Sequence, residues 1–172
     1  MSGILSDNIG RSSGLVKAAA AGGGWTLGTE QATTSGTSIT FTGIPSGTKQ
    51  IMIMLSQVSL SGGNDWLLTI GDAGGLETSG YYSISGSITS TAGFSLNVGD
   101  GSGLVTGQFM LSLEDSANFT WVSSHSLRSR ADMTSVGGGD KSLSAELTQV
   151  SITSTGGSQT FDSGAANIQY IS

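Results

Sequence analysis

Short segments rich in Ile, Val, Thr, Phe, Trp and Tyr follow one another through most of this chain, and Gly, Ser, Asn and Asp separate them. This pattern is typical of β-strands joined by tight turns. Beyond residue 24, no stretch of about 11 or more residues repeats its apolar positions with the 3.6-residue period of a helix. The segments expected to form strands are 25–32, 37–42, 49–58, 66–71, 80–85, 92–98, 104–113, 118–124, 126–134, 142–154, 158–161 and 166–171.

The spacing of these segments is close to the roughly 8–12 residues expected of a sandwich or barrel. Loops such as 61–65, 71–75, 99–103, 137–141 and 155–158 are short and rich in Gly, which suits tight turns. The sequence therefore predicts an all-β fold, a jelly-roll-like antiparallel β-sandwich. A β-solenoid is the second choice, because it needs a constant repeat period and no exact repeat is present.

The segment 49–58 is apolar on both of its faces. Alternation along a strand places Ile51, Ile53 and Leu55 on one face and Met52 and Met54 on the other. A strand of this kind is either central or turns its second face to another subunit. We therefore treat Met52 and Met54 as candidate inter-subunit contacts or a second core face.

The first 24 residues differ in composition from the rest and predict a separate N-terminal arm, followed by one domain over 25–172. The arm is expected to be extended or partly helical, because Leu15–Ala21 has helical propensity and Gly22–Gly24 then interrupts it. One interpretation is a flexible tail, and the other is an attachment segment that orders against a neighbouring subunit. The candidate contact residues of that segment are its larger apolar side chains, Ile4, Leu5, Ile9, Leu15 and Val16.

Charge and cysteine content exclude several classes of function. The net charge is −6 with only six Lys and Arg, whereas nucleic-acid-binding proteins usually carry a basic patch, so we expect no nucleic-acid partner. The chain has no Cys, which excludes a disulfide scaffold and a Cys-ligated zinc site. No apolar run approaches the ~18 residues of a membrane-spanning helix, so no membrane insertion is expected.

Residues that could carry catalysis are sparse. The one histidine, His125, has serines on both sides, but a Ser-His-Asp triad is assembled from separate segments. Glu114 and Asp115 are expected to lie in a solvated hairpin turn. Asp72, Asp100, Asp140 and Asp162 lie in or beside Gly-rich segments, where carbonyl and carboxylate oxygens could hold a structural Ca²⁺, although no calcium-binding spacing is present. We therefore expect no enzyme activity, no catalytic residue, no metal site and no cofactor.

Three segments resemble small β-domain structural proteins of tailed bacteriophages. They are GTSITFTGIPSGTKQIMIML (36–55), WLLTIGDAGGLETSGYY (66–82) and SGAANIQYI (163–171). The turn over Phe41–Pro45 that leads into an apolar strand, and the closing strand with Ile168 and Tyr170, carry the likeness. The opening MSGILSDNIGRSSGLVKA also resembles the start of virion proteins whose arm joins a neighbouring subunit.

This resemblance implies a non-enzymatic virion protein, assembled in the cytoplasm of a host bacterium and located in the phage particle. The first hypothesis is a tail fibre or tail-appendage subunit, a homotrimer that contributes to host attachment and contacts a host-surface glycan. Its partners would be other virion proteins, bound through the N-terminal arm. The alternatives are a capsid decoration (cement) protein that stabilises the head shell and, less favoured, a tail-associated polysaccharide-degrading enzyme.

Overall fold

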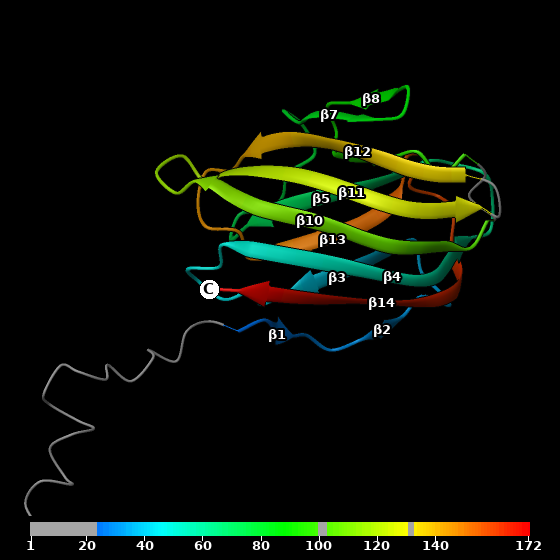
Figure 1. Ribbon diagram of the computed structural model, residues 1–172, viewed down its shortest axis with the longest axis horizontal. Coiled ribbons are helices and arrows are strands. Elements are labelled where there is room, and N and C mark those ends of the chain that lie inside the picture. Colours follow the sequence, from blue (N-terminus) through cyan, green and yellow to red (C-terminus); the bar gives the residue numbers. More distant parts are fainter. Residues whose placement is uncertain (1–23, 100–102, 131–132) are drawn as a thin grey trace, which may run out of the picture.

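The computed structural model describes residues 24–99, 103–130 and 133–172. Within these ranges the chain forms fourteen strands, arranged in two antiparallel sheets that pack face to face (Figure 1). None of the described residues forms a helix, so none belongs to a helix that could cross a membrane. The predicted all-β antiparallel sandwich is confirmed. The predicted arm over 1–24, with Ile4, Leu5, Ile9, Leu15 and Val16, lies outside the described residues except for Gly24.

The larger sheet has nine strands, and long strands form its centre. Its order is β1-β14-β4-β10-β11-β12-β7-β8, and β2 also pairs with β14. The bounds are β1 Thr26–Leu27, β2 Gln31–Ala32, β4 Gln50–Leu60, β7 Tyr82–Ser85, β8 Ile88–Ser90, β10 Val105–Asp115, β11 Thr120–Arg130, β12 Met133–Ser142 and β14 Phe161–Ile171.

The smaller sheet has five strands in the order β3-β13-β5-β6, and β9 also pairs with β5. The bounds are β3 Ser38–Thr42, β5 Trp66–Asp72, β6 Gly75–Leu76, β9 Phe94–Leu96 and β13 Gln149–Ser154. Consecutive strands often belong to different sheets, since β3, β5 and β13 lie in the smaller sheet and β4 and β14 in the larger one. Strands far apart in sequence therefore become neighbours, as in jelly rolls.

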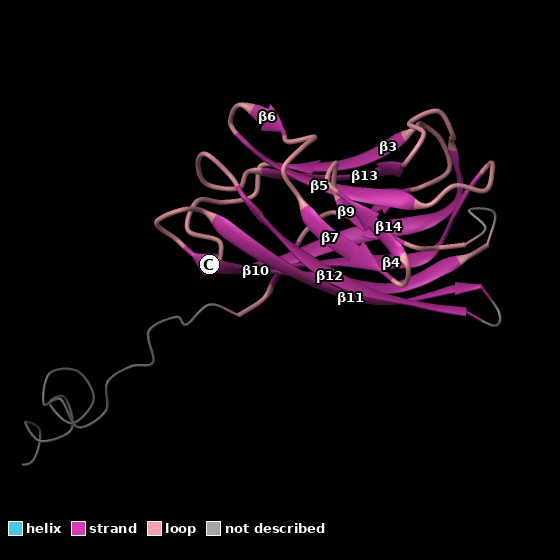
Figure 2. Cartoon of the chain, turned by 90° about the horizontal axis from the view of Figure 1, so that it is seen from above, coloured by secondary structure: helices cyan, strands magenta, loops and turns pink. Residues whose placement is uncertain are grey.

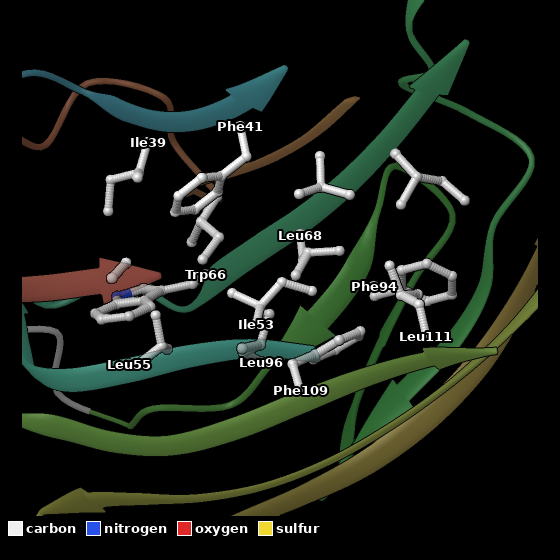
Figure 3. Packing of buried hydrophobic residues seen from close by; sticks show 14 of the residues in the cluster. Ile39, Phe41, Ile53, Leu55, Trp66, Leu68, Phe94, Leu96, Phe109 and Leu111 are labelled. Atoms are coloured by element: carbon white, nitrogen blue, oxygen red, sulfur yellow. The ribbon is translucent and has the colours of Figure 1, made fainter. Parts of the chain in front are cut away.

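The core lies between the two sheets. It is formed by the strand residues whose side chains point inward, which are every second residue along most strands. Figure 3 shows Ile53 and Leu55 of β4 together with Trp66 and Leu68 of β5. The Trp66 ring meets Phe161 edge-on, with a centroid separation of 5.7 Å. Trp66 of β5 and Trp121 of β11 are both buried in this core.

Between residues 118 and 154, the observed strands and turns differ from the predicted ones. The segments 118–124 and 126–134, expected as two strands, are mostly one strand, β11, and the second of them also includes the first two residues of β12. The turn expected at 137–141 lies inside β12. The glycines there do not bend the chain. They instead leave room for β7, because a Cβ on Gly139 would come within 2.2 Å of the Tyr82 carbonyl oxygen. The segment 142–154 forms a strand only from Gln149 onward.

Candidate functional site

We call the side of the nine-stranded sheet that is turned away from the smaller sheet the outer face. Along β4, Ile51 and Ile53 are fully buried, so the alternating Met52 and Met54 point outward and are half-buried by their neighbours. Met52 therefore forms no second core. Its cross-strand neighbours are Gln169 of β14 and Met110 of β10.

Cross-strand register extends this face over the whole sheet without a charged side chain in its middle. The row through Met52 contains, in order, Leu27, Gln169, Met52, Met110, Ser124, Gly138 and Ile84. The row through Met54 contains Asn167, Met54, Gln108, Ser126 and Val136. Soluble surfaces usually carry about 25–35% charged residues. The two rows together hold twelve residues, and none of them is charged.

The ends of this face expose apolar side chains. Leu27 is 63% exposed at the β1 edge, and Ile84 and Val136 are about half exposed near the opposite edge. The charged residues Arg128 and Asp140 belong to rows beside the two uncharged ones. Exposed apolar patches bordered by polar residues mark contact or ligand-binding surfaces more often than inert ones.

A groove lies at the β7–β8 end of the outer face, and we call it the Tyr82 groove. Its volume is about 710 Å³, and most of its lining surface is apolar. Figure 1 shows the β7–β8 hairpin beyond β12, at the edge of the large sheet. The residues that line the groove include Tyr82, Ile84, Thr89, Thr91, Gly138 and Gly139. None of its lining residues is charged.

Buried side chains that alternate with exposed ones along β7 hold the β7–β8 hairpin in place. Tyr81, Ser83 and Ser85 are buried, whereas Tyr82 and Ile84 point outward. The Tyr81 hydroxyl accepts a hydrogen bond from the Ile70 amide at 2.8 Å, and its ring meets Phe94 edge-on at 5.0 Å. Burial raises the pKa of Tyr81 to about 12, so the hydroxyl stays protonated and can also donate.

Ser83 and Ser85 bind the hairpin to the segment around β9. The Ser83 hydroxyl accepts a hydrogen bond from the Ser95 amide at 2.9 Å, and the Ser85 hydroxyl accepts one from the Asn97 amide at 3.0 Å. Figure 2 shows β7 of the larger sheet and β9 of the smaller sheet close together. Side chains that alternate with Tyr82 and Ile84 therefore hold the exposed part of the hairpin against the sandwich.

The one histidine, His125, lies among core side chains. His125 is buried, its ring stacks on Phe109 at 5.3 Å, and its Nε2 lies 3.0 Å from Ser85 Oγ and 3.4 Å from Ser135 Oγ. Its Nδ1 is buried and has no hydrogen-bond partner among the described residues, whereas a triad histidine has a carboxylate there. Burial lowers the pKa of His125 to about 4, so the ring is neutral near pH 7. This cluster is a hydrogen-bonded part of the core.

Three of the carboxylates considered at the sequence level, Asp72, Asp115 and Asp162, have local hydrogen-bond partners. Asp72 accepts hydrogen bonds from the Gly74 amide at 2.8 Å and the Ser144 hydroxyl at 2.5 Å, and these bonds lower its pKa. Asp115 shapes the β10–β11 turn by accepting from the Ala117 amide, as the predicted hairpin turn requires. Asp162 accepts from Ser59, and Asp100 lies outside the described residues. Within the described ranges, no three His, Asp or Glu side chains gather as metal ligands.

The Tyr82 groove was missed by the sequence analysis. The available signal was the consecutive pair Tyr81-Tyr82, since two adjacent residues of a strand point to opposite faces. The β12 glycines that complete the groove were instead interpreted as a turn. Comparisons with protein-family models, with curated proteins and with solved structures found no match for this chain. A functional proposal has to rest on the outer face, the groove and the sequence resemblance.

Proposed function

We propose that this chain is a non-enzymatic structural subunit of a tailed bacteriophage particle, a tail fibre or tail-appendage component that contributes to host attachment. The observation that carries the proposal is the uncharged outer face of the nine-stranded sheet. A repeated subunit with a charge of −6 repels its copies wherever acidic groups approach each other. The rows through Met52 and Met54 provide a contact surface free of this repulsion.

The side chains of this face suit packing between subunits. Met52, Met54 and Met110 are flexible and adapt to an opposing surface. Gln, Ser and Asn between them supply hydrogen-bond donors and acceptors without net charge. We propose a homotrimer in which the β14–β4–β10 part of this face makes the contacts, so that the β7–β8 end stays free, and residues 1–24 form an attachment arm to other virion proteins. The predictions for Ile4, Leu5, Ile9, Leu15 and Val16 belong to that arm.

The test is quantitative mass spectrometry of purified phage particles that encode this chain, with the major capsid protein as the internal reference. A ratio below about one to ten is the expected result for a tail component. Absence of the chain from particles would overturn the virion proposal. The measurement uses whole particles, so it does not depend on any ligand.

The same contact surface would serve a capsid decoration protein, which is the second candidate. The outer face would then lie against the shell, and the arm would cross to a neighbouring capsomer. A decoration protein is present in hundreds of copies, so a ratio near one to one would select it over the tail component. The enzyme alternative would instead require released oligosaccharide after the purified protein is incubated with host polysaccharide.

A further inference from the structure

We propose that the Tyr82 groove binds a neutral saccharide, with the Tyr82 ring as its stacking platform. This inference deepens the proposed attachment function and rests on it for its biological meaning. The binding chemistry itself rests on the side chains of the groove. These are an exposed aromatic ring, unpaired hydroxyls, a glycine floor and a lining without charged residues.

The Tyr82 ring is displayed to solvent. It is 80% exposed, more than any other large apolar side chain in the described ranges, and its hydroxyl has no hydrogen-bond partner there. The face of an aromatic ring is electron-rich and attracts the slightly positive C–H groups of an apolar surface. A pyranose ring presents such a C–H surface on one side and hydroxyls around its rim. Ile84, about half exposed, extends the apolar platform along β7.

Hydroxyl groups lie beside this platform on β8 and just after it. Thr89 is in register with Ile84, so the two side chains lie on the same face of the hairpin. Neither the Thr89 nor the Thr91 hydroxyl has a partner among the described residues, and both residues line the groove. A hydroxyl both donates and accepts, which matches the hydroxyls of a sugar.

Glycines form the floor because nothing larger fits there. Gly138 is in register with the outward-facing Ile84, and a Cβ on it would lie 2.8 Å from the Ser123 carbonyl oxygen. The floor is therefore backbone, and a ligand can approach it closely. Apolar walls with a few polar groups are typical of small-molecule sites.

Charge selects a neutral saccharide over an acidic one. Asp140 does not line the groove, but it is exposed and in register with Tyr82, so its side chain lies on the same face of the sheet beside the platform. It can accept hydrogen bonds from two sugar hydroxyls, but it repels a uronate or sialate group. No cation lines the groove to offset that repulsion.

Preorganisation favours binding at this hairpin. The buried Tyr81, Ser83 and Ser85 hold the backbone on either side of Tyr82 and Ile84. The platform is therefore in place before a ligand arrives, which lowers the entropy cost of binding.

The test applies the full-length protein to an array of neutral and acidic glycans, followed by an amide-shift NMR titration with the neutral glycan that binds best. We expect the largest shifts at Tyr82, Ile84, Thr89 and Gly138. Tyr82→Ala should weaken binding at least about tenfold, whereas Tyr82→Phe should keep most of it because the ring remains. The control variant is Leu104→Ala, which removes a 41%-exposed side chain just before β10 and should bind like the wild type.

Three results would overturn the proposal: no binding to any neutral glycan, binding to acidic glycans only, or binding that Tyr82→Ala leaves unchanged. Dissociation of an oligomer by Tyr82→Ala would also overturn it, by making the groove a contact between copies. The outcome is separable from that of the particle measurement. If the chain is present in particles but binds no neutral glycan, only the groove assignment is wrong. If the chain is absent from particles but binds a neutral glycan, only the virion proposal is wrong.

Discussion

His125 joins the core only in its neutral form, and this makes the stability of the protein depend on pH. The contacts that surround its ring come from Phe109, Ser85 and Ser135, none of which is charged. Its pKa is about 4 in the folded protein against an ordinary value of 6.5. The unfolded chain therefore binds a proton below about pH 6.5, and the folded protein does so only below about pH 4.

We expect the His125 contribution to the free energy of unfolding to be largest above pH 6.5. It should fall by roughly 2–3 kcal/mol between there and pH 4.5. Urea unfolding followed by Trp fluorescence at several pH values measures this loss. His125→Gln, which does not titrate, should lack this part of the pH dependence even if its stability at pH 7 is lower. An equal loss in both proteins would assign the pH dependence to other groups.

Loss of the side-chain hydroxyl should lower the stability of the protein at Tyr81 but not at its neighbour Tyr82. Tyr81→Phe removes the acceptor of the Ile70 amide and leaves that buried N–H unpaired. The expected cost is about 1–3 kcal/mol of unfolding free energy. Tyr82→Phe is the matched control, because its exposed hydroxyl has no partner in the described part of the chain, and it should leave stability unchanged. Equal stability of the two variants in urea unfolding would contradict the role of Tyr81 as an anchor of the hairpin.

At the scale of strands, the sequence predicted those whose alternation is regular and missed those fixed by tertiary contact. The segments 37–42, 49–58, 66–71 and 104–113 correspond to β3, β4, β5 and β10 within a few residues. The strand β8 has only three residues and no clear alternation, so its pairing with β7 could not be read locally. The run Gly137–Gly139 indicated a turn because the strand that packs against it lies some fifty residues earlier in the chain.

The glycines of β12 are therefore expected to be sensitive to a single methyl group. Gly137→Ala would place a Cβ 2.3 Å from the Ile84 carbonyl oxygen and 2.6 Å from His125 Cε1. Since the nearest atom is backbone, β7 would have to move, at a cost of about 2–3 kcal/mol. Gly24→Ala is the control, because nothing lies within 4 Å of that position. Thermal unfolding compares the two, and a wild-type midpoint for Gly137→Ala would refute the close packing of β7 on β12.

At the scale of the whole molecule, the sequence indicated a sandwich but not which of its surfaces would be free of charge. Met52 and Met54 could be assigned to one face of their strand by alternation alone. Pairings between strands that are distant in sequence extend the Met52 row to Gln169, Met110 and Ser124. The Tyr82 groove could not be predicted for the same reason, since β12 and the β7–β8 hairpin form it together.

If the outer face joins subunits, a charge placed in its centre should separate them. Met54→Lys puts an ammonium group into a row of uncharged side chains, where three symmetric copies would bring three such charges into the contacts. An unpaired charge buried at a contact costs several kcal/mol. We expect sedimentation velocity to find a trimer for the wild type and a monomer for Met54→Lys at the same concentration. Near-ultraviolet circular dichroism of Trp66 and Trp121 should be unchanged.

Thr155→Lys is the control for the change in net charge, because it adds the same group at an exposed turn after β13. It should remain trimeric. A wild-type protein that is monomeric at every concentration, or two variants that sediment alike, would remove the outer face as a subunit contact. Dissociation of Met54→Lys alone would instead identify this face as the surface through which copies of the chain assemble, because the two proteins differ only in where the lysine lies.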